Sequence, residues 1–124
     1  MSNSSAYSSV CPYLMIPEVE KQLSFLENVF EGKVKESKTN ENGQLQHAEI
    51  IIGDVVIMMG RAREIWPARQ SMNYVFVTNV DAVYEKALAL GAKSIAKPIK
   101  QGYGIYEGGI EDEFGNQWWI GSLL

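Results

Sequence analysis

The chain repeats itself at a fixed offset, and this is the feature that most restricts its fold. When Cys11 is aligned with Met72, 61 residues later, five more pairs of similar residues fall in the same register. They are Tyr13 with Tyr74, Met15 with Phe76, Ile16 with Val77, Val19 with Val80, and Glu20 with Asp81. The turn residues Gly53-Asp54 match Gly115-Asn116 at an offset one residue larger. Self-similarity of this kind indicates two copies of one supersecondary unit.

The first copy reads as a strand, a helix and three strands. Residues 10–16 alternate as a strand does, and Pro12 favours an edge position there. Residues 17–30 carry apolar residues at three- and four-residue spacing, with Pro17 in the first turn and Gly32 as the expected C-terminal cap. Further strands are expected at 33–38, 44–52 and 55–59.

The second copy has the same order. It comprises a strand at 72–77, a helix at 81–90 capped by Asn79 or Asp81 and ended by Gly91, a strand at 93–99, and a closing hairpin with a tight Gly115-Asn116 turn. We therefore predict an α+β fold. Its two βαβββ units, about residues 10–60 and 72–124, form a cupped or barrel-like mixed sheet with the helices outside, after a flexible tail at residues 1–9.

Composition narrows the class of protein. A chain of 124 residues with 46% hydrophobic content supports one domain, here residues 10–124. A formal charge of −4 without a basic run excludes nucleic acid as the expected partner. One cysteine excludes an internal disulfide, and the longest apolar run, residues 55–60, falls far short of the ~20 residues that cross a bilayer. We expect a cytoplasmic protein with no membrane partner.

Three segments resemble the glyoxalase, bleomycin-resistance and extradiol-dioxygenase (vicinal oxygen chelate) superfamily. They are Pro12-Tyr13-Leu14-Met15-Ile16-Pro17-Glu18-Val19-Glu20-Lys21, His47-Ala48-Glu49-Ile50-Ile51-Ile52-Gly53-Asp54 and Asp112-Glu113-Phe114-Gly115-Asn116-Gln117-Trp118. The chain is most similar to small bleomycin-resistance and PhnB-like members. This resemblance implies antibiotic resistance by ligand binding, and a homodimer whose cavities lie between the subunits.

The residues at the family's metal-ligand positions argue against metal catalysis. Mapped onto this chain, those positions hold Cys11, Ile57, Met72 and Trp119. A divalent metal needs three or four nitrogen, oxygen or thiolate ligands, and only Cys11 offers one. The resemblance therefore implies neither a metal nor another cofactor, and no catalytic residue is assigned.

The face on which each side chain lies is the next expectation. Alternation places Cys11 and Tyr13 on one face of their strand, and Trp118 and Trp119 on opposite faces of theirs. The resemblance implies that Cys11, Tyr13 and Trp119 face inward and line a cavity, while Trp118 faces a helix. Ile57 is also expected inward. A two-residue turn at Gly53-Asp54 then puts the acid-base pair His47 and Glu49 on the other face, and a shift of one residue reverses this.

We expect a non-catalytic protein that sequesters a hydrophobic or aromatic ligand, neutral or cationic. Trp119 and Tyr103 provide stacking surfaces, and Glu107 and Glu111 are candidate negative charges. The expected ligand-binding residues are Trp119, Tyr103, Trp66, Cys11, Tyr13, Ile57, Met72, Tyr106 and His47. Two alternatives remain open: a metal-dependent lyase, isomerase or dioxygenase with a displaced site at His47 and Glu49, and an interaction module with a filled cavity.

Overall fold

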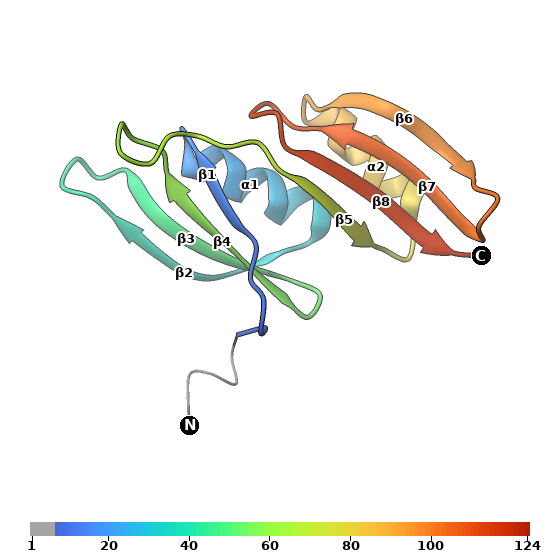
Figure 1. The fold of residues 1–124 in the computed structure, drawn as a ribbon, viewed down its shortest axis with the longest axis horizontal. Coiled ribbons are helices and arrows are strands. Elements are labelled where there is room, and N and C mark those ends of the chain that lie inside the picture. Colours follow the sequence, from blue (N-terminus) through green and yellow to red (C-terminus); the bar gives the residue numbers. More distant parts are fainter. Residues whose placement is uncertain (1–6) are drawn as a thin grey trace. The chain divides into compact units, whose positions relative to one another are not determined.

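A computed structural model describes residues 7–124, which form two compact units that meet in sequence between Arg69 and Gln70. Each unit contains one helix and four strands in the order β-α-β-β-β (Figure 1). The predicted repeat and the α+β class are confirmed. Each unit is described by itself below.

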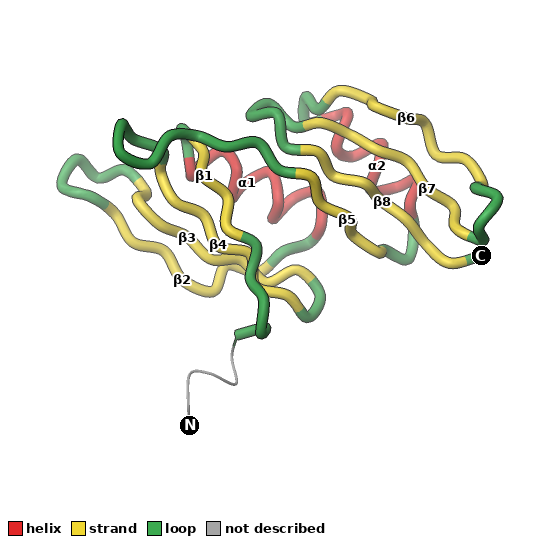
Figure 2. Tube along the Cα trace, in the orientation of Figure 1, coloured by secondary structure: helices red, strands yellow, loops and turns green. Residues whose placement is uncertain are grey.

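Unit 1 forms a mixed four-stranded sheet in the order β1-β4-β3-β2, with one helix on one face (Figure 2). Strand β1 pairs with β4 in parallel, and the other pairs are antiparallel. The elements are β1 (Tyr13–Ile16), α1 (Val19–Phe30), β2 (Lys33–Thr39), β3 (Leu45–Ile52) and β4 (Val55–Arg61). The first strand is shorter than predicted and lies at the sheet edge. Pro12, just before it, accepts a hydrogen bond from Met58 through its carbonyl alone.

The core of unit 1 lies between α1 and one face of this sheet. Leu26 of α1, Leu14 of β1, Ile50 of β3 and Met59 of β4 are all 2% exposed or less. Helix α1 begins two residues later than predicted, at Val19. Its burial pattern follows the three- and four-residue spacing seen in the sequence, because that spacing forms one apolar stripe.

The C-terminal cap of α1 differs from the prediction. Glu31, not Gly32, adopts the left-handed conformation, with φ of 55°. Gly32 is required for a different reason. A Cβ added there would lie 2.5 Å from the end of the Ile50 side chain, so the glycine permits close packing against β3.

Unit 2 repeats the arrangement with the sheet order β5-β8-β7-β6 and a parallel β5–β8 pair. The elements are β5 (Met72–Phe76), α2 (Val80–Ala89), β6 (Lys93–Lys100), β7 (Ile105–Glu111) and β8 (Gln117–Leu123). Of the two candidate caps, Asn79 caps α2, since its side chain accepts a hydrogen bond from the Ala82 amide. Trp118 is fully buried on the helix side, as predicted.

The connection between β7 and β8 is longer than the predicted tight turn. Glu111 pairs with Gln117, so residues 112–116 form a five-residue loop, whereas Gly53-Asp54 is a true two-residue turn between Ile52 and Val55. The buried Asp112 side chain organises the loop. It accepts hydrogen bonds from the amides of Phe114 and Asn116 and, at 2.9 Å, from the Trp118 indole.

Among residues 7–124, no helix has the length and apolar character needed to cross a membrane.

Candidate functional site

The register between β1 and β4 decides which side chains share a face in unit 1. Tyr13 pairs with Met58, and Leu14 pairs with the buried Met59. Ile57 pairs with Ile50, and both pack on the helix side, where Ile57 is only 5% exposed. The expectation that Ile57 faces inward is therefore wrong. The residue beside Tyr13 on the open face of the sheet is Met58.

A pocket of about 560 Å³ lies on this open face. Strands β1, β3 and β4 supply its wall, and the loop after β4 supplies its rim. The lining residues are Tyr13, Met15, Gln46, His47, Gly60, Arg63, Trp66 and Arg69. Three of the residues expected from the sequence to bind ligand, Tyr13, His47 and Trp66, thus come together. The other lining residues, Met15, Gln46, Gly60, Arg63 and Arg69, were missed, because their place at the pocket depends on pairings between distant strands and on the course of the loop.

His47 is held in the pocket wall through both ring nitrogens. Nδ1 lies 3.2 Å from the Tyr13 hydroxyl, and Nε2 lies 2.9 Å from Glu49 Oε2. The Tyr7 hydroxyl donates to the other Glu49 oxygen at 2.7 Å, and the Lys35 ammonium lies 4.1 Å from the centre of the Tyr7 ring. These contacts form one continuous polar network across the open face. Tyr7, which falls in the segment read from sequence as a tail, is part of it.

Glu49 is the buried carboxyl group of this polar network and is only 4% exposed. Burial raises the pKa of Glu49, but the hydrogen bonds from His47 and Tyr7, with the nearby positive charge of Lys35, outweigh it, so the net pKa lies below the ordinary value. Glu49 therefore carries its negative charge at neutral pH. That charge favours the tautomer in which His47 donates from Nε2 and accepts from Tyr13 at Nδ1.

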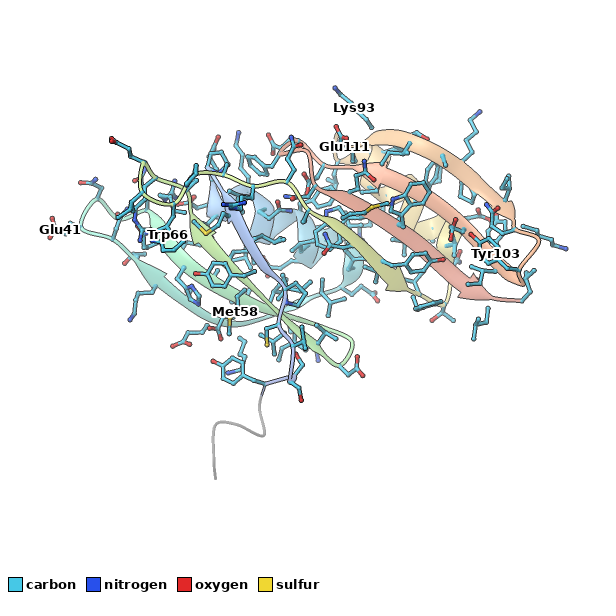
Figure 3. All side chains as sticks on the ribbon, viewed as in Figure 1. Glu41, Met58, Trp66, Lys93, Tyr103 and Glu111 are labelled. Atoms are coloured by element: carbon cyan, nitrogen blue, oxygen red, sulfur yellow. The ribbon has the colours of Figure 1, made fainter. Side chains whose placement is uncertain are left out.

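The loop after β4 is tied to β1 at both ends. The Ala62 amide donates to the Ile16 carbonyl at 2.8 Å, and the Arg69 amide donates to the Met15 carbonyl at 3.0 Å. An isolated bridge between Arg63 and Trp66 closes the loop on itself. Trp66 is 57% exposed, and Figure 3 places it on this loop. The loop thus holds a large aromatic side chain at the pocket without burying it.

Gly60 gives the pocket its depth beside Tyr13. A Cβ at this position would lie 2.9 Å from the Tyr13 hydroxyl and 3.2 Å from the Met15 sulfur. Any side chain here would displace both. The absence of a side chain on β4 lets the Tyr13 ring lie across the strand towards His47.

The open face of unit 2 carries several aromatic side chains. The Trp119 ring lies over Gly109, where a Cβ would approach the ring to within 2.8 Å. The Trp119 indole donates to the Gln117 side chain at 3.1 Å. Trp119 therefore shares the face of Gln117, as predicted, and is partly exposed.

Two tyrosines on this face bind one carboxylate. Glu107 accepts hydrogen bonds from Tyr74 at 2.7 Å and from Tyr103 at 3.0 Å. Burial raises the pKa of Tyr74 well above its ordinary value, and the Glu107 charge raises it further. Tyr103 is 63% exposed in the turn between β6 and β7 (Figure 3). Tyr103 and Trp119 thus lie on one unit, and Tyr13, His47 and Trp66 on the other.

Three other expected ligand residues lie outside the pocket. Cys11 is half-buried ahead of β1, and its thiol contacts Ser8 at 3.3 Å. Tyr106 donates to Asp81 of α2 at 2.6 Å, so it faces the helix of unit 2 rather than its open face. Met72 begins β5 and is 71% exposed.

The family's metal chemistry does not fit these residues. Ile57 faces the helix, Met72 and Met58 offer only thioethers, and the Trp119 indole is a donor. At the displaced position both nitrogens of His47 already have partners. Within residues 7–124 no three His, Cys, Asp or Glu side chains form a group that would hold a metal ion.

Comparisons with known proteins agree with this fold. Residues 10–120 match the family model described as Glyoxalase/Bleomycin resistance protein/Dioxygenase superfamily. An uncharacterized protein of Mycobacterium bovis, Mb0911c, is 23% identical over 125 residues, covering 92% of this chain and 82% of its own. TioX from Micromonospora sp. ML1 superposes with a TM-score of 0.76 at 19% identity, over 94% of this chain and 97% of that one.

A second solved structure is the fosfomycin resistance protein FosX from Mesorhizobium loti. It superposes with a TM-score of 0.70 at 12% identity, over 94% of this chain and 92% of that one. At these identities the structural matches establish the fold alone.

Proposed function

Because the chain belongs to the glyoxalase/bleomycin resistance/dioxygenase superfamily, in which one fold supports several activities, we propose that it binds a small aromatic or hydrophobic molecule without converting it. The pocket of unit 1 carries this proposal. Its volume of about 560 Å³ is within the ~300–1,000 Å³ typical of ligand sites. The name of FosX, a fosfomycin resistance protein, is consistent with a protective role.

The lining residues suit a planar ligand. Trp66 and Tyr13 offer aromatic faces from the loop and from β1, and Met15 adds an adaptable thioether surface. His47 is held by Tyr13 and Glu49, so its ring orientation is fixed before a ligand enters. A preorganised wall reduces the entropy lost on binding.

Titration with N-phenyl-1-naphthylamine, a neutral aromatic probe that fluoresces in apolar surroundings, tests the proposal. We expect saturable binding that weakens about tenfold in Trp66→Ala, a loss of about 1.4 kcal/mol. Ile65→Ala is the matched control, because Ile65 is 74% exposed in the same loop but does not line the pocket. Equal binding by wild type and Trp66→Ala would exclude this pocket as the site.

The two alternatives give different results. A metal-dependent enzyme would retain near-stoichiometric Zn, Ni, Mn or Fe after purification without chelator and lose it in His47→Ala. An interaction module with a filled cavity would bind none of a panel of planar probes.

We also propose that the protein is a homodimer. The support is the open face of unit 2, where Phe76 is 62% exposed and Met72 is 71% exposed; large exposed apolar patches mark interaction sites. Light scattering after size exclusion should give twice the chain mass, and Phe76→Glu should shift it to the monomer. A monomeric wild type would reject the dimer.

A further inference from the structure

The pocket of unit 1 has a cationic rim. Arg63 and Arg69 are the charged residues among those that line it, and no carboxylate does so within residues 7–124. Glu49, on the same face of the sheet, already accepts hydrogen bonds from His47 and Tyr7. The charged side chains that line the pocket are therefore both positive, although the chain as a whole carries −4.

A comparison with Arg61 shows that these two guanidinium groups differ from a structural arginine. Arg61 donates to both Glu20 oxygens at 2.6 and 2.7 Å and to the carbonyls of Pro17 and Leu45. Its charge is neutralised within the fold. Arg63 and Arg69, by contrast, make no ion pair with any residue of the described chain, 7–124.

The hydrogen-bonding capacity of the rim is also unused. One Arg63 nitrogen reaches the Arg61 carbonyl at 3.5 Å, the outer limit for such a bond. No hydrogen bond joins the Arg69 guanidinium to residues 7–124, although its backbone amide is anchored to Met15 at 3.0 Å. This backbone hydrogen bond fixes the position of the Arg69 main chain, while its guanidinium group remains available to a ligand.

From this arrangement we infer that the ligand of the pocket is a planar aromatic anion, a carboxylate, sulfonate or phosphate ester, with its acidic group bound by Arg63 and Arg69. Guanidinium groups bind such oxyanions through paired, charge-assisted hydrogen bonds. The aromatic part then lies against Trp66 and Tyr13. This inference rests on the proposed function and specifies its ligand class. It replaces a cationic ligand at this pocket by an anionic one.

Two probes with the same ring system separate the anion from the aromatic contact. The anionic probe is 8-anilinonaphthalene-1-sulfonate, and its neutral counterpart is N-phenyl-1-naphthylamine. Both are titrated into wild type, Arg63→Gln, Arg69→Gln and the double variant. Lys93→Gln, an exposed cation of unit 2 (Figure 3), is the charge-matched control. Circular dichroism confirms that each variant is folded.

We expect the double variant to bind the sulfonate about tenfold more weakly, while affinity for the neutral probe changes less than about twofold. Added salt should weaken binding of the sulfonate and leave binding of the neutral probe unchanged, since salt screens the interaction between exposed charges. The inference is overturned if the affinity for the sulfonate falls no more than the affinity for the neutral probe when the arginines are replaced. It is also overturned if Lys93→Gln weakens sulfonate binding as much as the double variant does.

The failures are distinguishable. If binding of the neutral probe weakens in Trp66→Ala, while sulfonate affinity is unchanged in both arginine variants, the proposed function stands and the anionic ligand class is wrong. If neither probe binds the wild type, the proposed function is wrong and the anion inference fails with it.

Discussion

Nε2 of His47 lies 2.9 Å from Oε2 of Glu49, two residues further along β3. Side chains two apart on a strand share a face, so this pair stands on the open face of unit 1 beside the pocket. The Tyr13 hydroxyl meets the opposite ring nitrogen at 3.2 Å. The imidazole is thus fixed from both sides, and its orientation depends on the charge of Glu49.

Glu49→Gln should destabilise the fold above the ordinary pKa of the carboxyl group. Because the folded-state pKa is lowered, the charged form contributes stability above the unfolded-state pKa, and that contribution is lost as pH falls through the folded-state pKa. We expect the free energy of unfolding at pH 7 to fall by about 1–3 kcal/mol, as for a buried hydrogen bond to a charged group. The difference from wild type should shrink in acid.

Urea titrations from pH 3 to pH 7 measure this, with Glu27→Gln on the exposed side of α1 as the control. A Glu49→Gln difference that is constant across the range would show that its charge has no part in stabilising the fold.

Asp112→Asn should destabilise unit 2 by about 1–3 kcal/mol, the cost of leaving buried donors without a charged acceptor. The buried carboxylate receives two amides of its own loop and the Trp118 indole. Asp54→Asn makes the same chemical change in the exposed turn of unit 1 and should be near neutral. Denaturant unfolding compares them, and equal effects would contradict the structural role of Asp112.

Gly109→Ala should displace the Trp119 ring. A methyl group 2.8 Å from the ring carbons cannot be accommodated without movement, and such overpacking costs about 1–3 kcal/mol. The near-ultraviolet circular dichroism of the tryptophans should change. Gly102→Ala is the control, because its added methyl meets open space. An unchanged spectrum in Gly109→Ala would mean that the ring does not lie over this glycine.

Tyr74→Phe should remove a tyrosine whose ionisation is shifted to higher pH. Burial and then the Glu107 charge raise the pKa of Tyr74 above its ordinary value of 10.0. The protonated, hydrogen-bonded phenol therefore stabilises the fold fully below the unfolded-state pKa, and this stability is lost as the pH rises through the folded-state pKa. Ultraviolet titration at alkaline pH should lose a late component in the variant. Loss of an early component instead would contradict the Tyr74–Glu107 interaction.

The sequence predicted the repeated unit and the faces of Tyr13 and Trp118 because those depend on local patterns. The offset that aligns Tyr13 with Tyr74 also aligns their observed partners, Met58 with Trp119. Alternation within the strands then correctly placed Trp118 on the helix side and Tyr13 on the open side.

The sequence could not predict the register between β1 and β4, which are far apart along the chain. A strand shifted by one residue presents its other face, and this is why Ile57 was placed on the wrong side and why the face of His47 was left open. Tyr7 was missed for a related reason: its contact with Glu49 joins residues 42 apart. The sequence also could not place Arg63 and Arg69 at the pocket, because their position depends on the backbone hydrogen bonds that tie their loop to β1.

Amide and indole chemical shifts of the isotope-labelled protein, recorded during a titration with N-phenyl-1-naphthylamine, test the pocket most directly. Ligand binding in unit 1 predicts the largest shifts at the Trp66 indole and at the amides of His47 and Gly60, with little change at Trp119 and Tyr103. Shifts concentrated at Trp119 and Tyr103, or none at saturating probe, would contradict the assignment of the ligand site to this pocket.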